Sequence, residues 1–184
     1  MQSKNFDIEI LNINHVQLRL DYYLANKKHL EIWHPTTPDG FYTFKYQENK
    51  IKGNIELMNN GESMHFVILN KSKTEMLGHC NYTKINNSKC WLGYSISKTS
   101  EGKSIMYEAL LLANSYVNNN LGVNEIRAGI LPSNGRSIKL IKRLDFEHIG
   151  QKDELEINGE MRTYDTYIQK VIKQSKIYIK KNNC

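Results

Sequence analysis

The chain has 184 residues, of which 40% are hydrophobic, 24% charged and 10% aromatic, a composition that is typical of one globular domain. A chain of this length buries roughly 70% of its unfolded surface, so its fold needs no disulfide or metal for support. The 11 Gly and 3 Pro exclude a collagen-like protein or a linker-dominated one. The formal net charge of +6 points first to an anionic partner such as nucleic acid, a membrane surface or a phosphorylated ligand.

The excess positive charge is concentrated at the C-terminal end of the chain. Five lysines follow the last acidic residue, Asp165, and they account for five of the six excess charges, so residues 1–169 carry a net charge of +1. These lysines are Lys170, Lys173, Lys176, Lys180 and Lys181. We therefore expect one domain over residues 1–171 and a basic tail over residues 172–184, for which a solvated chain end is the simplest interpretation.

The cysteine pattern and the lack of long apolar runs indicate a cytoplasmic protein that does not contact a membrane. The three cysteines, Cys80, Cys90 and Cys184, cannot all pair with one another and show no C-x-x-C spacing. We interpret them as free thiols in a reducing compartment. The N-terminus lacks an apolar segment of signal-peptide length, and apolar runs such as Ala109–Ala113 are far too short to span a bilayer.

The first third of the chain is predicted to be mostly helical. A strand at Asp7–Leu11 precedes a helix that opens at Asn14, a good N-cap residue. A second, short helix carries Trp33 and should stop before Pro35. A longer polar helix then runs to the turn residues at 59–61.

The middle of the chain predicts an antiparallel meander followed by a crossover. Three strands are expected at Met64–Asn70, Met76–Ile85 and Cys90–Ser97. A long amphipathic helix from Gly102 and a buried strand near residues 126–131 follow. This order of strand, helix and strand should join two parallel strands.

The last third should complete a mixed sheet. Pro132-Ser133-Asn134 is expected to cap another helix. Two final strands, at Phe146–Glu156 and Arg162–Val171, flank the hairpin signal Asn158-Gly159. The predicted fold is therefore of the α+β type, with helices on the faces of the sheet.

The junction between the strand at Cys90–Ser97 and the helix from Gly102 is the most informative segment. Free N–H groups in a first helical turn and the positive end of the helix dipole bind anions, and Gly102 and Lys103 suit a phosphate. The Gly-Lys-Ser sequence is reminiscent of a nucleoside-triphosphate loop, but Ser97 stands where that motif requires a glycine. An anion site of another kind, or a plain helix start, is left open by the residues alone.

This junction resembles the acetyl-CoA motif R/Q-x-x-G-x-G/A of the GCN5-related N-acetyltransferases (GNAT). Gly102 matches the central glycine, whereas Thr99 replaces the first residue and Ser104 the last glycine. Residues 131–146 are similar to a second signature of the family, N-x-x-S-x-x-L ending in L/G-F. The positions that match are Asn134, Ser137, Leu140 and Phe146, and Asp145 replaces the usual glycine.

Two further blocks resemble the Rim-type ribosomal-protein N-acetyltransferases, particularly those that modify an N-terminal alanine. Residues 25–35 are similar to the segment N-R-x-x-L-x-x-W-x-P, and residues 157–159 with Tyr167 to an I-N-G turn and a late tyrosine. Thr163 and Tyr164 stand where that subfamily has aspartate and histidine. The four blocks cover most of the chain in the order that the family requires.

The resemblance implies a GNAT fold, in which a twisted, mostly antiparallel mixed sheet of about seven strands has central parallel strands that splay apart. Acetyl-CoA would be the cosubstrate and would lie in this split, with no metal involved. Asn134 would position a pantetheine amide, and backbone groups would bind the rest of the cofactor. These groups belong to Tyr94, Ser95 and Ile96 for the pantetheine arm and to Glu101, Gly102, Lys103, Ser104 and Ile105 for the pyrophosphate.

The resemblance also implies that an amine attacks the thioester directly. It places Ser137 beside the sulfur as the proton donor, and Glu156 is the best candidate for the base, although a solvated strand face explains Glu156 equally well. His34 and His79 are alternative bases, or packing residues. Trp33 is a candidate wall of the acceptor site, with core packing as the alternative.

The expected function is acetylation of the N-terminal α-amino group of a ribosomal protein, in the first place the alanine of the fifth small-subunit protein. An N-terminal amine has a pKa of roughly 8, against roughly 10.4 for lysine, so it needs only a modest base. A small-amine (polyamine-type) acetyltransferase is one alternative, and a non-catalytic, CoA-binding, ribosome-associated RNA-binding module is another. The basic tail is a candidate contact for ribosomal RNA or an acidic partner.

Overall fold

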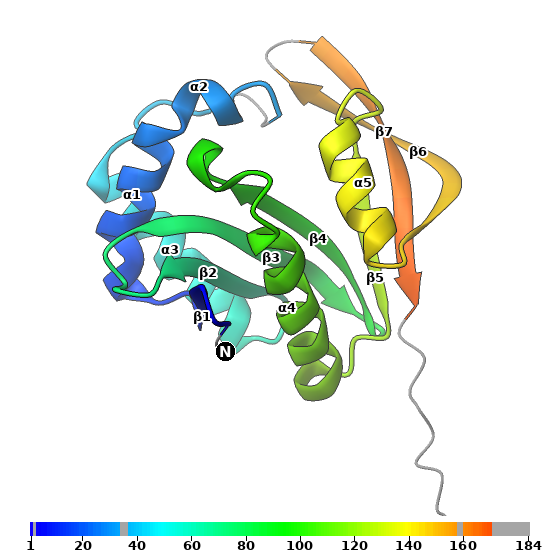
Figure 1. Cartoon of the computed structure of the whole chain (residues 1–184), viewed down its shortest axis with the longest axis horizontal. Helices are drawn as coiled ribbons and strands as arrows, with labels where there is room; N and C mark the ends of the chain where they lie inside the picture. The colour runs from blue at the N-terminus through cyan, green and yellow to red at the C-terminus, as the bar shows by residue number, and fades with distance from the viewer. Residues whose placement is uncertain (2, 34–36, 158–159, 171–184) are drawn as a thin grey trace, which may run out of the picture.

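A computed structural model describes residues 1, 3–33, 37–157 and 160–170, with the backbone alone at residues 155–157. Seven strands form one mixed sheet in the order β1-β2-β3-β4-β5-β7-β6, as Figure 1 shows. The predicted fold class is confirmed. The strands are β1 (Phe6–Ile10), β2 (Met64–Asn70), β3 (Met76–Asn86), β4 (Lys89–Ile96), β5 (Glu125–Ile130), β6 (Glu147–Ile157) and β7 (Glu160–Lys170). The helices are η1 (Ile13–His15), α1 (Val16–Ala25), α2 (Lys27–Leu30), α3 (Phe44–Asn59), η2 (Lys98–Ser100), α4 (Ile105–Leu121) and α5 (Gly135–Arg143).

Helices cover both faces of the sheet and form two hydrophobic clusters. On one face, α4 and α5 pack on the strands around fully buried side chains such as Tyr82, Leu110 and Ile126. On the other face, α1, α2 and α3 enclose a second cluster that includes Val67 and Ile51. Burial of this much apolar surface is the main favourable contribution to the folding free energy.

The helices of the first third begin and end at slightly different residues from those predicted. Asn12, not Asn14, caps the start of this segment as the N-cap of η1, which leads into α1: its side chain accepts a hydrogen bond from the N–H of Asn14 at 3.0 Å. The helix α2 ends at Leu30, so Trp33 lies in the turn that follows and not in the helix. Pro35, expected to stop this helix, falls outside the described residues.

The three strands of the meander agree with the prediction to within one residue at every end. β2, β3 and β4 are antiparallel neighbours, and β5 pairs with β4 in parallel after the long helix α4. The helix after residues 132–134 is α5, and the side chain of Asn134 caps it by accepting from the N–H of Ser137 at 3.1 Å. None of the helices in the described ranges is both long and apolar enough to cross a membrane.

Candidate active site

The parallel pairing of β4 with β5 stops part-way along both strands. It joins Lys89 to Glu125, Cys90 to Ile126 and Trp91 to Arg127. β4 then continues to Ile96 and β5 to Ile130 with no further pairing between them. Figure 1 shows β4 and β5 diverging beyond this point, with the start of α4 on one side and α5 on the other. The divergence creates the split between central strands that the sequence resemblance implied.

Backbone groups of β4 line this split. On its other side, β4 pairs with β3, and the N–H of Ser97 donates to the carbonyl of Leu77 at 2.7 Å. Because residues of a strand alternate in the direction of their backbone hydrogen bonds, Ser95 directs its N–H and C=O toward β3. Tyr94 and Ile96 therefore direct theirs into the split, where β5 no longer provides partners.

The loop before α4 offers N–H groups to an anion at one end of the split. Gly102 and Ser104 both have a left-handed backbone, with φ of 73° and 59°. The first helical hydrogen bond of α4 runs from the N–H of Glu108 to the carbonyl of Ser104 at 3.1 Å. The N–H groups of Gly102, Lys103, Ser104 and Ile105 meet no acceptor among the described residues. A Cβ on Gly102 would have no atom within 4 Å, so this backbone is open to a ligand.

Ser137 lies on α5 and contacts β4 across the split. Its hydroxyl and the hydroxyl of Tyr94 are 2.5 Å apart. Burial raises the pKa of Tyr94 to about 12, although the hydrogen bond with Ser137 acts in the opposite direction. The phenol therefore keeps its proton at neutral pH and can donate it to the Ser137 oxygen, which leaves the serine hydrogen free to point toward a ligand.

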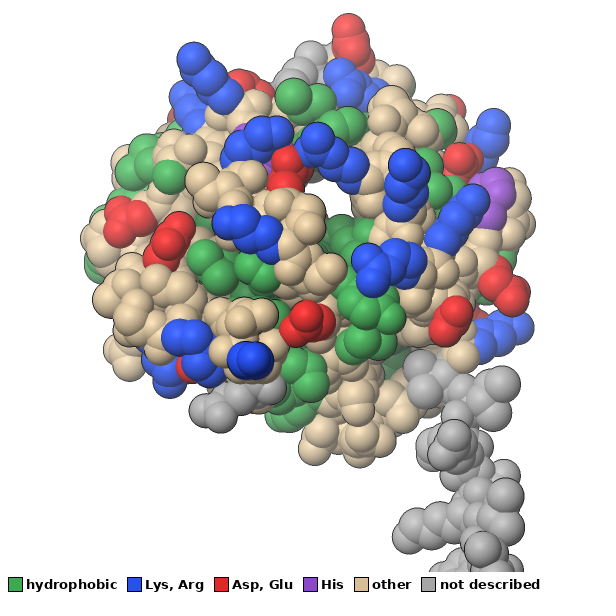
Figure 2. Space-filling view, in the orientation of Figure 1, with side chains coloured by type: hydrophobic (Ala, Val, Ile, Leu, Met, Phe, Trp, Pro, Cys, Tyr) green, Lys and Arg blue, Asp and Glu red, His purple; other side chains and the backbone are tan. Residues whose placement is uncertain are grey.

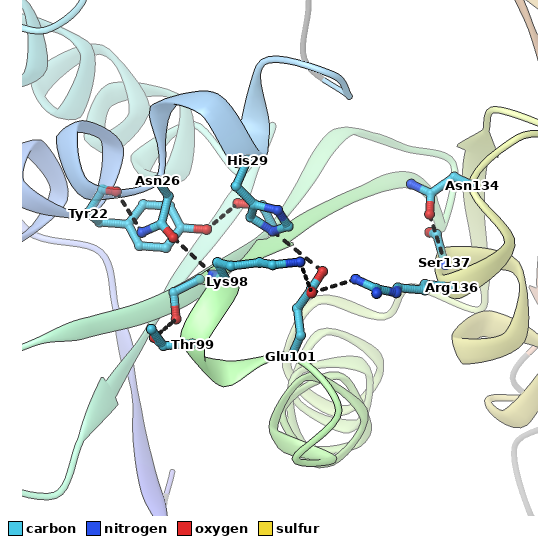
Figure 3. A network of polar contacts seen from close by, with 11 residues as sticks. Tyr22, Asn26, His29, Lys98, Thr99, Glu101, Asn134, Arg136 and Ser137 are labelled. Atoms are coloured by element: carbon cyan, nitrogen blue, oxygen red, sulfur yellow. Dashed lines mark hydrogen bonds and ion pairs between the residues drawn. The ribbon is translucent and has the colours of Figure 1, made fainter.

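Glu101 joins the loop before α4 to two other elements. Its carboxylate lies 3.5 Å from Nε2 of His29 on α2, 3.1 Å from Nζ of Lys98 on η2 and 2.5 Å from a guanidinium nitrogen of Arg136 on α5. Figure 3 shows these contacts, and Figure 2 shows that Lys and Arg side chains surround a hollow in this face. Burial acts to raise the pKa of Glu101, but the hydrogen bonds from Lys98 and Arg136 outweigh it and hold that pKa below its usual value. Glu101 is therefore ionised at neutral pH.

Comparison with known proteins identifies the family to which this split sheet belongs. Residues 18–147 match the acetyltransferase (GNAT) domain family. The chain is a GNAT protein. The [ribosomal protein uS5]-alanine N-acetyltransferase of Escherichia coli is 30% identical to it over 148 residues, which are 78% of this chain and 76% of that protein.

Solved structures confirm the GNAT fold over nearly the whole chain. The ribosomal-protein-S5-alanine acetyltransferase from Vibrio fischeri superposes with a TM-score of 0.90 at 21% identity, covering 95% of this chain and 98% of that one. RimJ of Mycobacterium smegmatis in complex with CoA-disulfide superposes with a TM-score of 0.83 at 19% identity, covering 90% of this chain and 85% of that one. The GNAT fold and its family thus identify the chain as an N-acetyltransferase.

The side chain of Ser95 belongs to a buried polar network behind the split. Its hydroxyl is 2.8 Å from the hydroxyl of Tyr22 and 2.8 Å from Nε2 of His79. The network continues from His79 through Asn81 to His65, which also contacts Ser63. His79, one of the alternative bases, is therefore tied into the protein interior, with 9% of its surface exposed.

The turn that contains Trp33, a residue expected to line the acceptor site, contacts the last strand of the sheet. Trp33 is half-buried in the turn after α2, and the neighbouring Ile32 carbonyl lies 3.5 Å from a guanidinium nitrogen of Arg162 on β7. This contact brings the Trp33 turn next to the β6–β7 hairpin. Glu156 is on β6 with its backbone paired to Met161, but its side chain is outside the described part of the structure, as are His34 and the turn at residues 158–159.

Sequence reasoning missed three side chains that the fold brings to the split. The Tyr94 hydroxyl, His29 and Arg136 all contact residues that are 35 or more positions away along the chain. Arg136 lies directly before Ser137 in the family signature, which is a signal that could have indicated it. Nothing in the local pattern around His29 indicates a partner on another element.

Proposed function

We propose that this GNAT protein binds acetyl-CoA in the split between β4 and β5 and acetylates the N-terminal α-amino group of a ribosomal protein, with alanine as the first residue. The observation that carries the proposal is the end of β4–β5 pairing at Trp91 and Arg127, beside a loop of unpaired N–H groups. The named activities of the E. coli and V. fischeri relatives support this acceptor. Such an acceptor is made in the cytoplasm, which agrees with the free thiols expected from the sequence.

The cofactor fits the split through backbone groups. The N–H and C=O groups of Tyr94 and Ile96 can pair with the amides of the pantetheine arm as an additional strand would. The N–H groups of residues 101–105 can bind the pyrophosphate at the positive end of the α4 dipole. Ser95, also expected to bind this arm through its backbone, is not part of the proposal, because its backbone faces β3. Asn134 has its side-chain oxygen occupied in capping α5, which leaves its amide N–H groups for a pantetheine carbonyl.

The transfer itself needs one bond formed and one broken. The neutral α-amine attacks the thioester carbonyl, a C–N bond forms, and the C–S bond breaks to release CoA as a thiolate. The amine loses a proton to a base or to water, and the thiolate gains one from an acid. An α-amino group with a pKa of roughly 8 is partly neutral at pH 7, so a weak base is enough to accept its proton.

Ser137 is the proposed acid and Tyr94 its positioning residue. When Tyr94 donates to the Ser137 oxygen, one of the two directions that this contact allows, the serine O–H can point at the sulfur of a cofactor held along β4. As Ser137 gives its proton to the thiolate, the Tyr94 hydrogen bond stabilises the charge left on the serine oxygen. Glu156 is proposed as the base and Trp33 as a wall of the acceptor site, next to the Arg162 contact.

Replacing Ser137 by Ala tests the acid. We expect turnover, followed as CoA thiol release with an alanine-initiated peptide, to fall by about 100-fold, because general acid catalysis of this kind contributes that much. The KM for acetyl-CoA should change less than about twofold, because the cofactor is bound by backbone groups. Ser133→Ala, an exposed serine before α5, is the matched control.

Two results would contradict this proposal. If Ser137→Ala turns over at the rate of the wild type, Ser137 is not the acid. If the wild type releases no thiol with any peptide, although it binds CoA, the proposed peptide acetylation is wrong, and the small-amine and the non-catalytic alternatives take its place.

A further inference from the structure

The carboxylate of Glu101 occupies an unusual place for a negative charge. Glu101 is the first residue of the loop whose free N–H groups form the anion site, and it gathers the cationic side chains of Lys98 and Arg136. Each of these cations comes from a different element, η2 and α5 respectively. An acid at the centre of an anion site competes with the anion for the same partners.

The exposed fractions of the three side chains show that Lys98 and Arg136, more than Glu101, can change partners. The Glu101 side chain is 21% exposed, whereas those of Lys98 and Arg136 are 61% and 75% exposed. Long, exposed side chains reorient at little cost, and no other acidic partner of either cation occurs among the described residues. Both cations are thus free to follow a stronger anion that arrives at the loop.

A diphosphate is a stronger partner for these cations than a single carboxylate. It offers several charged oxygens, and a guanidinium binds two of them at once. Thr99 stands where the family motif has Arg or Gln, so that position lacks the long hydrogen-bond donor of either side chain. Figure 3 shows Lys98 and Arg136 on either side of the Glu101 carboxylate, with Asn134 and Ser137 on the same side as Arg136.

We propose that Glu101 is a built-in competitor of the cofactor's phosphates: in the empty site it holds Lys98 and Arg136, and the diphosphate of CoA takes both cations over when it binds. The inference rests on the proposed function for the identity of the ligand. It assigns Lys98 and Arg136 as phosphate-binding residues and gives the Glu101 carboxylate an inhibitory effect on cofactor affinity. Removing the negative charge should therefore tighten binding, which the loss of a merely structural contact would not do.

Titration calorimetry with CoA and with pantetheine, which lacks the phosphates, tests this inference. We expect Glu101→Gln to lower the Kd for CoA by about two- to fivefold, the effect of a partly exposed ion pair. Arg136→Gln should raise that Kd by about three- to tenfold. Lys139→Gln, an exposed lysine on α5, is the matched control and should change nothing. Binding of pantetheine should be the same in all four proteins.

Several outcomes would overturn the inference. It is wrong if Glu101→Gln weakens CoA binding or leaves it unchanged, or if Arg136→Gln alters pantetheine binding as much as CoA binding. Thermal unfolding of each variant separates a folding defect from a binding effect, and the charge-preserving Arg136→Lys should retain part of the affinity. If the wild type binds CoA and acetylates peptides while Glu101→Gln does not tighten CoA, the inference alone fails. If the wild type binds no CoA at all, the proposed function fails with it.

Discussion

Ser104 and Asp145 are the two positions at which this chain lacks a glycine of the family signatures, and both have a left-handed backbone with φ of 59°. The family's glycines are thus explained by conformation, since side chains other than glycine rarely adopt this region. Asp tolerates it better than most residues, because its short polar side chain can hydrogen-bond locally. The Ser104 side chain makes no capping hydrogen bond to α4, so no such bond offsets the strain of its left-handed backbone.

We therefore predict that Ser104→Gly stabilises the protein. Relief of the left-handed strain should exceed the entropy that glycine loses on folding, for a net gain of about 1 kcal/mol. In a protein of this size the gain corresponds to a rise in Tm of about 2–4 °C. Ser104→Ala, which keeps the strain and removes only the hydroxyl, is the control, and an equal Tm for wild type and Ser104→Gly would contradict the explanation.

Local signals predicted some of the residue-scale features and not others. The Asn134 cap and the glycine turn at Gly102 depend on neighbours in sequence, and the structure shows the cap and a left-handed backbone at Gly102. The cap at Asn12 was misassigned to Asn14 because both are asparagines at the helix start, and only the backbone angles distinguish them. The contacts of Tyr94 with Ser137 and of Glu101 with Arg136 depend on tertiary packing, which no local pattern contains.

At the scale of elements, strands were predicted more accurately than helices. β2 runs from Met64 to Asn70, as the sequence indicated: six consecutive side chains are buried, and the strand ends at the polar, half-buried Asn70. The polar helix α3 begins at Phe44, and Thr43 is its N-cap. The spacing of the apolar residues in this segment did not predict where the helix begins. The parallel pairing of β4 with β5 followed from the crossover rule, whereas the residue at which the pairing stops did not.

The polar network that joins β2, β3 and β4 predicts a specific pH dependence of stability. Burial lowers the pKa of His65, and the positive charges of Arg19 and Lys50 add to this effect, against the opposing hydrogen bond with Asn81. The folded state therefore keeps His65 neutral at a pH where the unfolded chain, with an ordinary histidine pKa near 6.5, takes up a proton. The stability that results is complete above this pH and is lost progressively as the pH falls below it.

We expect the wild type to lose more stability between pH 8 and pH 5.5 than the His65→Gln variant does. The glutamine can still hydrogen-bond Asn81 and Ser63, so the comparison isolates titration from packing. Urea unfolding at both pH values measures the free energy of unfolding. An identical pH-dependent loss in the two proteins would show that His65 does not titrate differently in the folded and unfolded states.

For the whole molecule, the net charge of +6 has two separate origins. Five of the excess charges belong to lysines after Asp165, while the rest of the chain is nearly neutral and brings Lys98 and Arg136 together at the Glu101 carboxylate. A general affinity for nucleic acid is therefore not needed to explain the charge. The basic C-terminal segment and a net charge of +1 over residues 1–169 account for it.

Truncation after residue 171 tests the predicted division into a domain and a tail. β7 ends at Lys170, where it still pairs with Glu125 of β5. We expect the truncated protein to keep the Tm of the full chain to within about 2 °C, the shift expected for a change below 1 kcal/mol, and to keep its activity on short peptides. A large loss of Tm would place part of the tail in the folded domain.

Mass spectrometry of acetylated peptides tests the central claim most directly. The full-length protein is incubated with acetyl-CoA and peptides that begin with Ala or Ser, together with an N-terminally blocked peptide that carries an internal Lys, and with spermidine as a small amine. The account predicts one acetyl group on the N-terminal α-amine, fastest for the peptide that begins with Ala. Acetylation confined to the internal Lys or to spermidine would contradict it.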